Sequence, residues 1–283
     1  MRKEYWKHFA AAIAALSALA TLATALFDLG WIKECLISGT LGTILVILAS
    51  CFYAKWQVRI KKKVALMLYS EMKLTIKEGD LFEQKGVICI PFNEYFDTHV
   101  GNGVVENSSL HGLFINKYYG DRVKELDSKI RKLLPDVFLD ECERRVDDCP
   151  KKRYELGTCV DIREGENTYV LFALSHFDKD DKAYISRSEY AQVIEKLMEH
   201  LSKIVGNKPV YMPLIGAGLT RISRTPQRIL IHLVDILDFE DRYSIPGGVN
   251  ILIKSLNSVK VNLNTVEDVV KKGVLQMDKT IEL

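Results

Sequence analysis

The sequence predicts an α/β domain that follows an N-terminal pair of apolar helices. Four short runs rich in Val, Ile and Leu carry apolar side chains at successive positions, as strands covered on both faces do. They are residues 87–90, 169–174, 210–214 and 249–253. Segments with apolar residues at helical spacing lie between them, including 121–134, 188–205 and the stretch from 225 onward. Strands that alternate with helices predict one sheet with helices on both faces.

Two apolar stretches without a charged residue precede this domain, at residues 9–27 and 35–54. A membrane-spanning helix needs roughly 20 apolar residues, and both stretches have that length. The sequence therefore predicts a transmembrane helical hairpin over residues 1–56. We expect a helical linker over residues 57–73, and the α/β domain over residues 74–283.

The distribution of basic residues predicts how this hairpin is oriented. Arg2 and Lys7 precede the first stretch and the run Lys61–Lys63 follows the second, whereas the connecting loop has Lys33 alone. Basic residues favour the cytoplasmic side of a membrane. Both termini are therefore expected in the cytoplasm of a cell whose inner membrane holds the hairpin.

Two other readings of the apolar stretches remain open at this point. The first stretch has a basic start and an Ala-Thr-Ala exit at residues 23–25, which is also typical of a cleaved secretory signal. Alternatively, the two stretches form a buried helical hairpin of a soluble protein. The density of Leu, Ile and Val between residues 41 and 52 argues against that second alternative.

Composition excludes two classes of function. The net charge is only +2 and no long basic stripe runs through the α/β part, so nothing favours nucleic-acid binding. Cys89, Cys142, Cys149 and Cys159 show no CxxC or Cys/His spacing, so no metal site is predicted. No cofactor is expected.

Three loops that follow predicted strands are the candidate binding elements, because open α/β sheets bind ligands at the carboxyl ends of their strands. The first is Gly79-Asp80-Leu81. Its acidic side chain is a candidate ligand contact, although Asp80 in such a turn also suits the cap of a helix.

The second loop begins where a buried strand runs into Asn93 and continues to Gly101, Gly103 and Val104. An Asn side chain offers both a donor and an acceptor, which suits a pair of sugar hydroxyls. Glycines let the backbone approach a ligand closely. The alternative is an Asn-capped turn followed by a flexible glycine loop.

The third loop, Pro213 to Leu219, leads toward a helix that starts at Pro226. A strand, a glycine loop and a helix start form the arrangement that cradles phosphates with backbone N–H groups. The loop is neither GxGxxG nor a P-loop, and an ordinary strand-to-helix turn is the alternative. Arg221 and Arg224 lie in its extended part and are candidates to grip a carboxylate in a bidentate manner; solvated surface arginines are the alternative.

In this order and spacing, the three loops resemble those of the macro domain, a module that binds ADP-ribose. The resemblance covers about residues 74–256 and implies a three-layer α/β/α sandwich with a mixed sheet. It places Asp80 by the adenine, Asn93 by the distal ribose, and Gly216–Leu219 by the diphosphate. The candidate ligand-binding residues are Asp80, Leu81, Asn93, Gly101, Gly103, Val104, Gly216, Ala217, Gly218, Leu219, Arg221 and Arg224. Ile90 replaces the first Asn of the family motif, which argues against catalysis more than against binding.

Two N-terminal spans before such a domain, together with residues 92–98 and 108–112, resemble the membrane-anchored macro effectors of bacterial Thoeris antiphage systems. The resemblance implies a partner TIR enzyme that makes a signal from NAD, similar to ADP-ribose joined to histidine. It also implies that the effector is not an enzyme, and that it disrupts the membrane after binding the signal.

Small residues at Ala10, Ala14 and Ala18 on one side of the first stretch, with Gly39 and Gly42 in the second, suit close helix association and a homo-oligomer; the alternative is that Ala is merely tolerated where it faces lipid. Two other functions stay open. One is a membrane-tethered ADP-ribosyl hydrolase, and the other is a nucleotide-regulated anchor. Asn93 is the candidate catalytic residue of the hydrolase.

Overall fold

The computed structural model describes residues 2–26, 40–57, 61–101, 103–141, 149–178, 182–218, 224–239 and 242–270. The chain forms two compact units, Met1–Ile60 and Lys61–Leu283.

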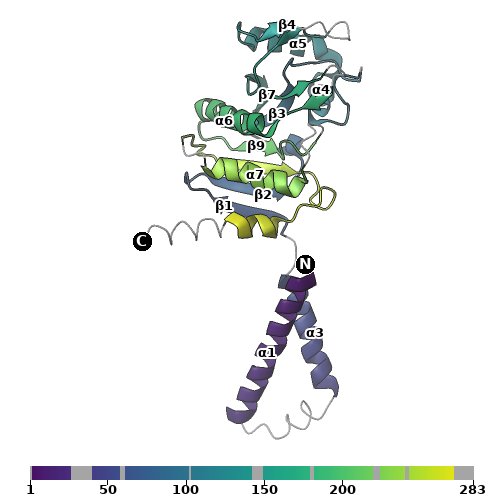
Figure 1. The fold of residues 1–283 in the computed structure, drawn as a ribbon, viewed down its shortest axis with the longest axis vertical. Coiled ribbons are helices and arrows are strands. Elements are labelled where there is room, and N and C mark those ends of the chain that lie inside the picture. The colour runs from purple at the N-terminus through teal and green to yellow at the C-terminus, as the bar shows by residue number, and fades with distance from the viewer. Residues whose placement is uncertain are drawn as a thin grey trace. The chain divides into compact units, whose positions relative to one another are not determined.

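The first unit consists of two helices in contact, α1 (Arg2–Leu26) and α3 (Thr40–Gln57) (Figure 1). They cover most of the two stretches expected to span a membrane, while residues 27–39 lie outside the described residues. Of the residues that the structure describes, no helix is both long and apolar enough to cross a membrane. The predicted transmembrane hairpin is therefore not found there.

The expected helical linker over residues 57–73 is wrong, because this segment contains a strand. Residues 63–67 form β1 (Lys63–Met67), which pairs antiparallel with β2 (Lys73–Glu78). Val64 and Leu66 are buried, whereas their neighbours along β1 are exposed. A period of two is that of a half-buried edge strand, and it overrides the helical continuation from α3.

The second unit is built on a mixed sheet whose neighbouring strands are far apart in the sequence. In spatial order they are β1, β2, β10 (Val249–Ile253), β9 (Val210–Pro213), β3 (Val87–Asn93), β7 (Asn167–Phe177) and β6 (Cys159–Glu164). The five strands from β2 to β7 are parallel, and β1 and β6 are antiparallel to their neighbours. The short strand β8 (Ala183–Tyr184) pairs with β7, and β4 (Asp140–Glu141) pairs with β5 (Lys152–Arg153).

Helices cover both faces of this sheet. They are α4 (Leu110–Tyr119), α5 (Val123–Leu133), α6 (Arg187–Ile204) and α7 (Pro226–Phe239), with two short 3-10 helices, Leu81–Glu83 and Gly120–Arg122. On β6, Asp161 accepts a hydrogen bond from His200 of α6, whereas Glu164 pairs with Lys129 of α5. Side chains alternate between the two faces along a strand, so residues 161 and 164, three positions apart, face opposite sides. Helices α6 and α5 therefore lie on opposite faces, with α7 beside α6 (Figure 1).

The core of this unit confirms the α/β prediction. The four strands predicted from apolar runs are β3, β7, β9 and β10, and the three predicted helices are α5, α6 and α7. Side chains in the interior of β3 and β7 are almost fully buried, because both are central strands covered on both faces. The segment after Asn257 also joins the core: residues 263–270 are helical, and Leu263 and Val266 are buried.

Candidate functional site

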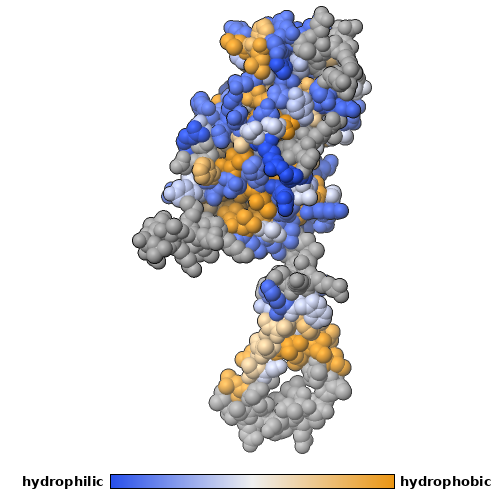
Figure 2. Space-filling model, viewed as in Figure 1, coloured by the Kyte–Doolittle hydropathy of each residue, from blue (hydrophilic) through white to orange (hydrophobic). Residues whose placement is uncertain are grey.

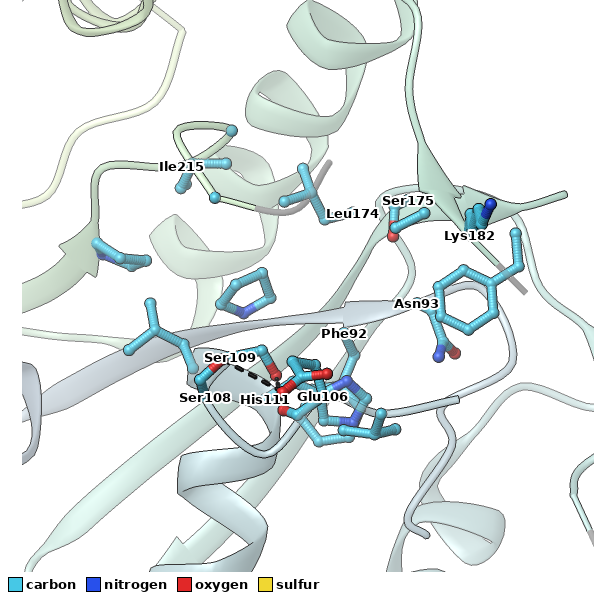
Figure 3. A pocket seen from close by; sticks show the side chains of 18 of the residues that line it. Phe92, Asn93, Glu106, Ser108, Ser109, His111, Leu174, Ser175, Lys182 and Ile215 are labelled. Carbon is cyan, nitrogen blue, oxygen red and sulfur yellow. Dashed lines mark hydrogen bonds between the residues drawn. The ribbon is translucent and has the colours of Figure 1, made fainter. Parts of the chain in front are cut away.

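A cavity of about 610 Å³ opens where β3, β7 and β9 end. Its volume lies in the range of about 300–1,000 Å³ that is usual for small-molecule sites. Figure 3 shows Ile215, Leu174 and Ser175 facing Ser108, Ser109 and His111 across it. The cavity therefore lies at the carboxyl ends of parallel strands, where the three candidate loops were expected to meet.

Asn93 ends β3 at the cavity, but its side chain mainly organises its own loop. Its Oδ1 accepts hydrogen bonds from the backbone N–H groups of Tyr95 (3.0 Å) and Asp97 (3.3 Å). Its Nδ2 donates to Asp97 Oδ2 at 2.8 Å, and only 2% of the residue is exposed. The amide therefore fixes the turn that forms this wall of the cavity.

An aromatic pair forms another wall. The rings of Phe92 and His111 have their centroids 3.6 Å apart and an interplanar angle of 37°. His111 Nε2 lies 2.7 Å from the carbonyl oxygen of Asp97, so this nitrogen carries the proton and donates. Burial lowers the pKa of His111 to about 3. The ring is therefore neutral at physiological pH, which leaves Nδ1 as an acceptor.

The N-terminus of α4 lies at the same wall, because Leu110 and His111 both line the cavity. Ser109 caps the helix by accepting a hydrogen bond from the backbone N–H of Gly112 (3.0 Å), and its hydroxyl donates to the carbonyl of Glu106 (2.7 Å). The positive end of a helix dipole at a cavity favours an anionic ligand group.

The third loop closes the cavity on the β9 side. Gly216 has φ of +83°, a left-handed conformation that glycine adopts without strain. The carbonyl of Ile215 accepts a hydrogen bond from the buried hydroxyl of Tyr190 on α6, at 3.0 Å. The loop is therefore tied to the helix layer behind it. Residues 219–223 lie outside the described residues.

A partly buried charge network holds the β7 side of the cavity. His176 Nδ1 lies 2.6 Å from Glu94 Oε2, and His176 Nε2 lies 3.0 Å from Glu189 Oε1. Glu94 also accepts a hydrogen bond from the backbone N–H of Phe177, which lines the cavity. The hydrogen bond to Glu94, followed by that to Glu189, raises the pKa of His176. The network joins the end of β3, the end of β7 and the start of α6.

Comparison with known proteins is decisive for the α/β unit. The macro-domain family of the Thoeris protein ThsA matches residues 74–254, more than half of the chain. The chain belongs to this family.

Individual relatives agree with the assignment to the ThsA macro-domain family. The Thoeris protein ThsA of Bacillus amyloliquefaciens (strain Y2) is 29% identical over 213 residues, which cover 71% of this chain and 69% of that protein. The Oceanobacillus iheyensis macrodomain with MES bound has a TM-score of 0.50 at 11% identity, over 74% of this chain and 98% of that one. A mutant of that macrodomain with ADPR has the same TM-score at 10% identity, over 74% and 99%. These structural likenesses show the shared macro-domain fold.

The structure brings five of the candidate ligand-binding residues to the cavity: Asn93, Gly103, Val104, Gly216 and Gly218. Among the described residues, Asp80, Leu81, Gly101, Ala217 and Arg224 do not line it. Leu219 and Arg221 lie outside the described residues.

Asp80 acts as a helix cap, which was the alternative role considered for it from the sequence. Its carboxylate accepts a hydrogen bond from the backbone N–H of Phe82 at 2.8 Å and caps the 3-10 helix Leu81–Glu83. Arg224 lines a different cavity, which is described below.

Several lining residues were not recognised as site residues from the sequence. The most informative are Phe92, His111, Ser175, Phe177 and Lys182. Phe92 and His111 lie in the two segments that resemble the Thoeris effectors, but the packing of α4 on β3 is what brings the two side chains together. The end of β7 offered a usable signal for the site, because the apolar run of this strand is followed by the polar residues Ser175 and His176 at its carboxyl end.

Proposed function

We propose that the chain is an antiphage effector whose macro domain binds an ADP-ribose-type nucleotide in the cavity between β3, β7 and β9. The ligand is a conjugate of ADP-ribose with an amino acid such as histidine, made from NAD by a TIR-domain partner. Binding drives self-association of the chain, and the N-terminal helices then disrupt the inner membrane of the bacterial cell.

The observation that carries this proposal is that two glycine loops and the start of α4 converge on one cavity. Gly103 and Gly216 both have positive φ, +86° and +83°, and both line it. Backbone exposed at such glycines, together with a helix N-terminus, suits a diphosphate. The volume of about 610 Å³ has room for a dinucleotide-sized ligand that stays partly open to solvent.

The geometry at Asn93 favours binding without turnover. Both ends of its amide are engaged by Tyr95 and Asp97, so the side chain is poorly placed to activate a water molecule. Position 90, where the macro-domain motif has its first Asn, holds a fully buried Ile in β3. We therefore propose a receptor and not a hydrolase.

The helix pair supplies the proposed output. Its exposed large apolar side chains include Trp6, Leu19, Leu22, Ile44, Leu45, Ile47, Leu48 and Phe52. Figure 2 shows hydrophobic residues gathered on the part of the helix pair that is coloured. Contiguous apolar surface of this kind marks a contact with lipid or with other copies of the chain.

The binding proposal is tested by calorimetric titration of the full-length chain with ADP-ribose, its histidine conjugate and AMP. Gly218→Trp should reduce affinity at least about tenfold, since Gly218 lines the cavity with open space at its Cβ position and the indole will fill that space. Gly120→Trp is the matched control, because Gly120 also has open space but lies away from the cavity.

Chromatography of the same mixtures separates the candidate functions. Recovery of unchanged ligand supports a receptor, whereas release of free ADP-ribose from the conjugate or from modified protein supports the hydrolase. Absence of binding to all three compounds would refute the nucleotide proposal.

A further inference from the structure

A second cavity, of about 180 Å³, lies between the first turns of α6 and α7. Its described lining residues are Arg187, Tyr190, Arg224, Arg228, Ile229 and His232. Three of these six carry a guanidinium group, and none is acidic. Neither Arg187 nor Arg228 forms an ion pair with a described residue.

Such a concentration of positive charge is unfavourable in an empty cavity and favourable around an anion. Arg187 and Arg228, which form no ion pair with a described residue, repel each other at this small cavity, and the paired N–H donors of a guanidinium match the oxygens of a phosphate. Pro226 is the first residue of α7, so the positive end of that helix adds to the field.

The size and walls of the cavity limit what it takes. A volume of about 180 Å³ is well below the range of nucleotide sites, but it holds a phosphate group with a few waters. The back wall is the ring of Tyr190, which stacks on His232 with centroids 5.9 Å apart. His232 adds a further ring N–H donor at the rim.

We propose that this cavity is a separate phosphate-binding site, with Arg187, Arg224 and Arg228 as its ligands. It is distinct from the nucleotide cavity, although both adjoin the same loop. Tyr190 lines the second cavity while its hydroxyl binds the carbonyl of Ile215, which lines the first. A phosphate bound to the arginines will restrain Tyr190 and, through it, the loop that closes the nucleotide cavity.

The site is tested with inorganic phosphate on the full-length chain, by ³¹P line broadening and calorimetry at constant ionic strength. We expect saturable binding with Kd of about 1 mM or tighter. Arg187→Ala and Arg228→Ala should each weaken it at least about tenfold, and Arg228→Lys less, because Lys keeps the charge but not the paired donors. Arg163→Ala is the matched control, since Arg163 is exposed on β6.

Gly218→Trp distinguishes this site from the nucleotide cavity, because it blocks only the latter. Phosphate binding that survives Gly218→Trp and is lost in Arg228→Ala supports the proposal, even if no nucleotide binds. Phosphate binding that is lost in Gly218→Trp and kept in Arg228→Ala would overturn it, as would absence of saturable binding to the wild type.

Sedimentation with lipid vesicles identifies the source of the phosphate group. Vesicles of neutral lipid with and without phosphatidic acid are sedimented with the wild type, with Arg228→Ala and with Arg163→Ala. Binding that requires phosphatidic acid and Arg228, and that inorganic phosphate displaces, assigns the site to a lipid headgroup. Equal sedimentation with both vesicle types, alongside saturable inorganic phosphate binding, assigns it to a soluble phosphate.

Discussion

At the start of α4, one glycine is fixed by close contact with the loop that precedes it. A Cβ atom on Gly112 would lie 2.3 Å from the carbonyl oxygen of Glu106, which is backbone and not easily displaced. Gly112→Ala should therefore lower the free energy of unfolding by about 1–3 kcal/mol, as overpacking does, and weaken ligand binding by moving His111. Urea denaturation and calorimetry measure the two effects.

Gly120→Ala is the control at the other end of the same helix. Nothing lies within 4 Å of a Cβ at Gly120, and its φ is −42°. Its stability should equal or slightly exceed that of the wild type, because Ala is the better helix former. Equal destabilisation by the two substitutions would contradict the role assigned to Gly112.

His176 makes part of the stability depend on pH. Its pKa is raised in the folded state by Glu94 and then Glu189, with Arg153 within 4.0 Å of Glu94 and the ring of Tyr184 beside the imidazole. A raised pKa means that the stabilisation is fully present below the unfolded value of about 6.5 and is lost as pH rises through the folded value.

His176→Gln should therefore cost about 1.5–3 kcal/mol at pH 6, the value of hydrogen bonds to charged groups, and much less at pH 9. Urea denaturation at both values measures this difference. Glu189 does not titrate between pH 6 and pH 9, because its hydrogen bonds to Ser186 lower its pKa to about 2. His99→Gln, at an exposed position, is the control. A cost for His176→Gln that is the same at both pH values would contradict the charge network.

At the scale of single elements, β1 shows the clearest departure from the sequence prediction, and it can be tested directly. Leu66 is 7% exposed and Met67 is 64% exposed, although they are neighbours. Leu66→Ala should cost about 2–5 kcal/mol through the cavity that it leaves, while Met67→Ala should cost little. Thermal or urea unfolding of the two variants is sufficient. Similar costs would mean that β1 does not alternate as an edge strand.

The elements that the sequence predicts correctly are those whose signal is local. The apolar runs of β3, β7, β9 and β10 can be recognised in the sequence because these strands are covered on both faces. The strand β1 was read as a helix because it lies only a few residues after an apolar stretch and is only five residues long. The short strands β4, β5 and β8 have two residues each, too few for any periodicity.

The candidate site was predictable only where it consists of loops. Glycine loops and the Asn93 turn have recognisable residue types, so their convergence could be expected from their places after strands. The contact between Phe92 and His111 depends on where α4 packs, and Glu94 meets His176 across 82 positions of sequence. Neither contact has a local signal, because both are products of tertiary packing.

Among the described residues, the hydroxyl of Tyr190 on α6 is hydrogen-bonded to the third loop, and this bond can be removed by one substitution. Tyr190→Phe deletes the hydroxyl that binds the carbonyl of Ile215 and keeps the ring. A hydrogen bond of about 1 kcal/mol predicts a loss of ADP-ribose affinity of about fivefold, measured by calorimetry. Tyr211→Phe, on β9, is the control. Unchanged affinity in Tyr190→Phe would show that the loop does not depend on this contact.

For the whole molecule, the proposed function requires binding and membrane damage to reside in different units and to be separable. Leu45, Leu48 and Phe52 of α3 are 63%, 61% and 75% exposed, so little of their area is needed for the fold of the helix pair. Their joint replacement by Ser should abolish lipid contact, because burial of a large apolar side chain contributes about 1.5–3 kcal/mol. The nucleotide affinity of the macro unit should stay unchanged.

Vesicle sedimentation and dye release with the full-length chain, with and without the nucleotide, measure the lipid step, and calorimetry measures the binding step. Val137→Ser with Leu139→Ser is the matched control, because these side chains are 83% and 55% exposed in the other unit. We expect the control to bind nucleotide and release dye, and the α3 variant to bind nucleotide only. Dye release by the α3 variant at the wild-type level would contradict the assignment of membrane damage to α3, because the lipid-active surface would then lie outside these residues.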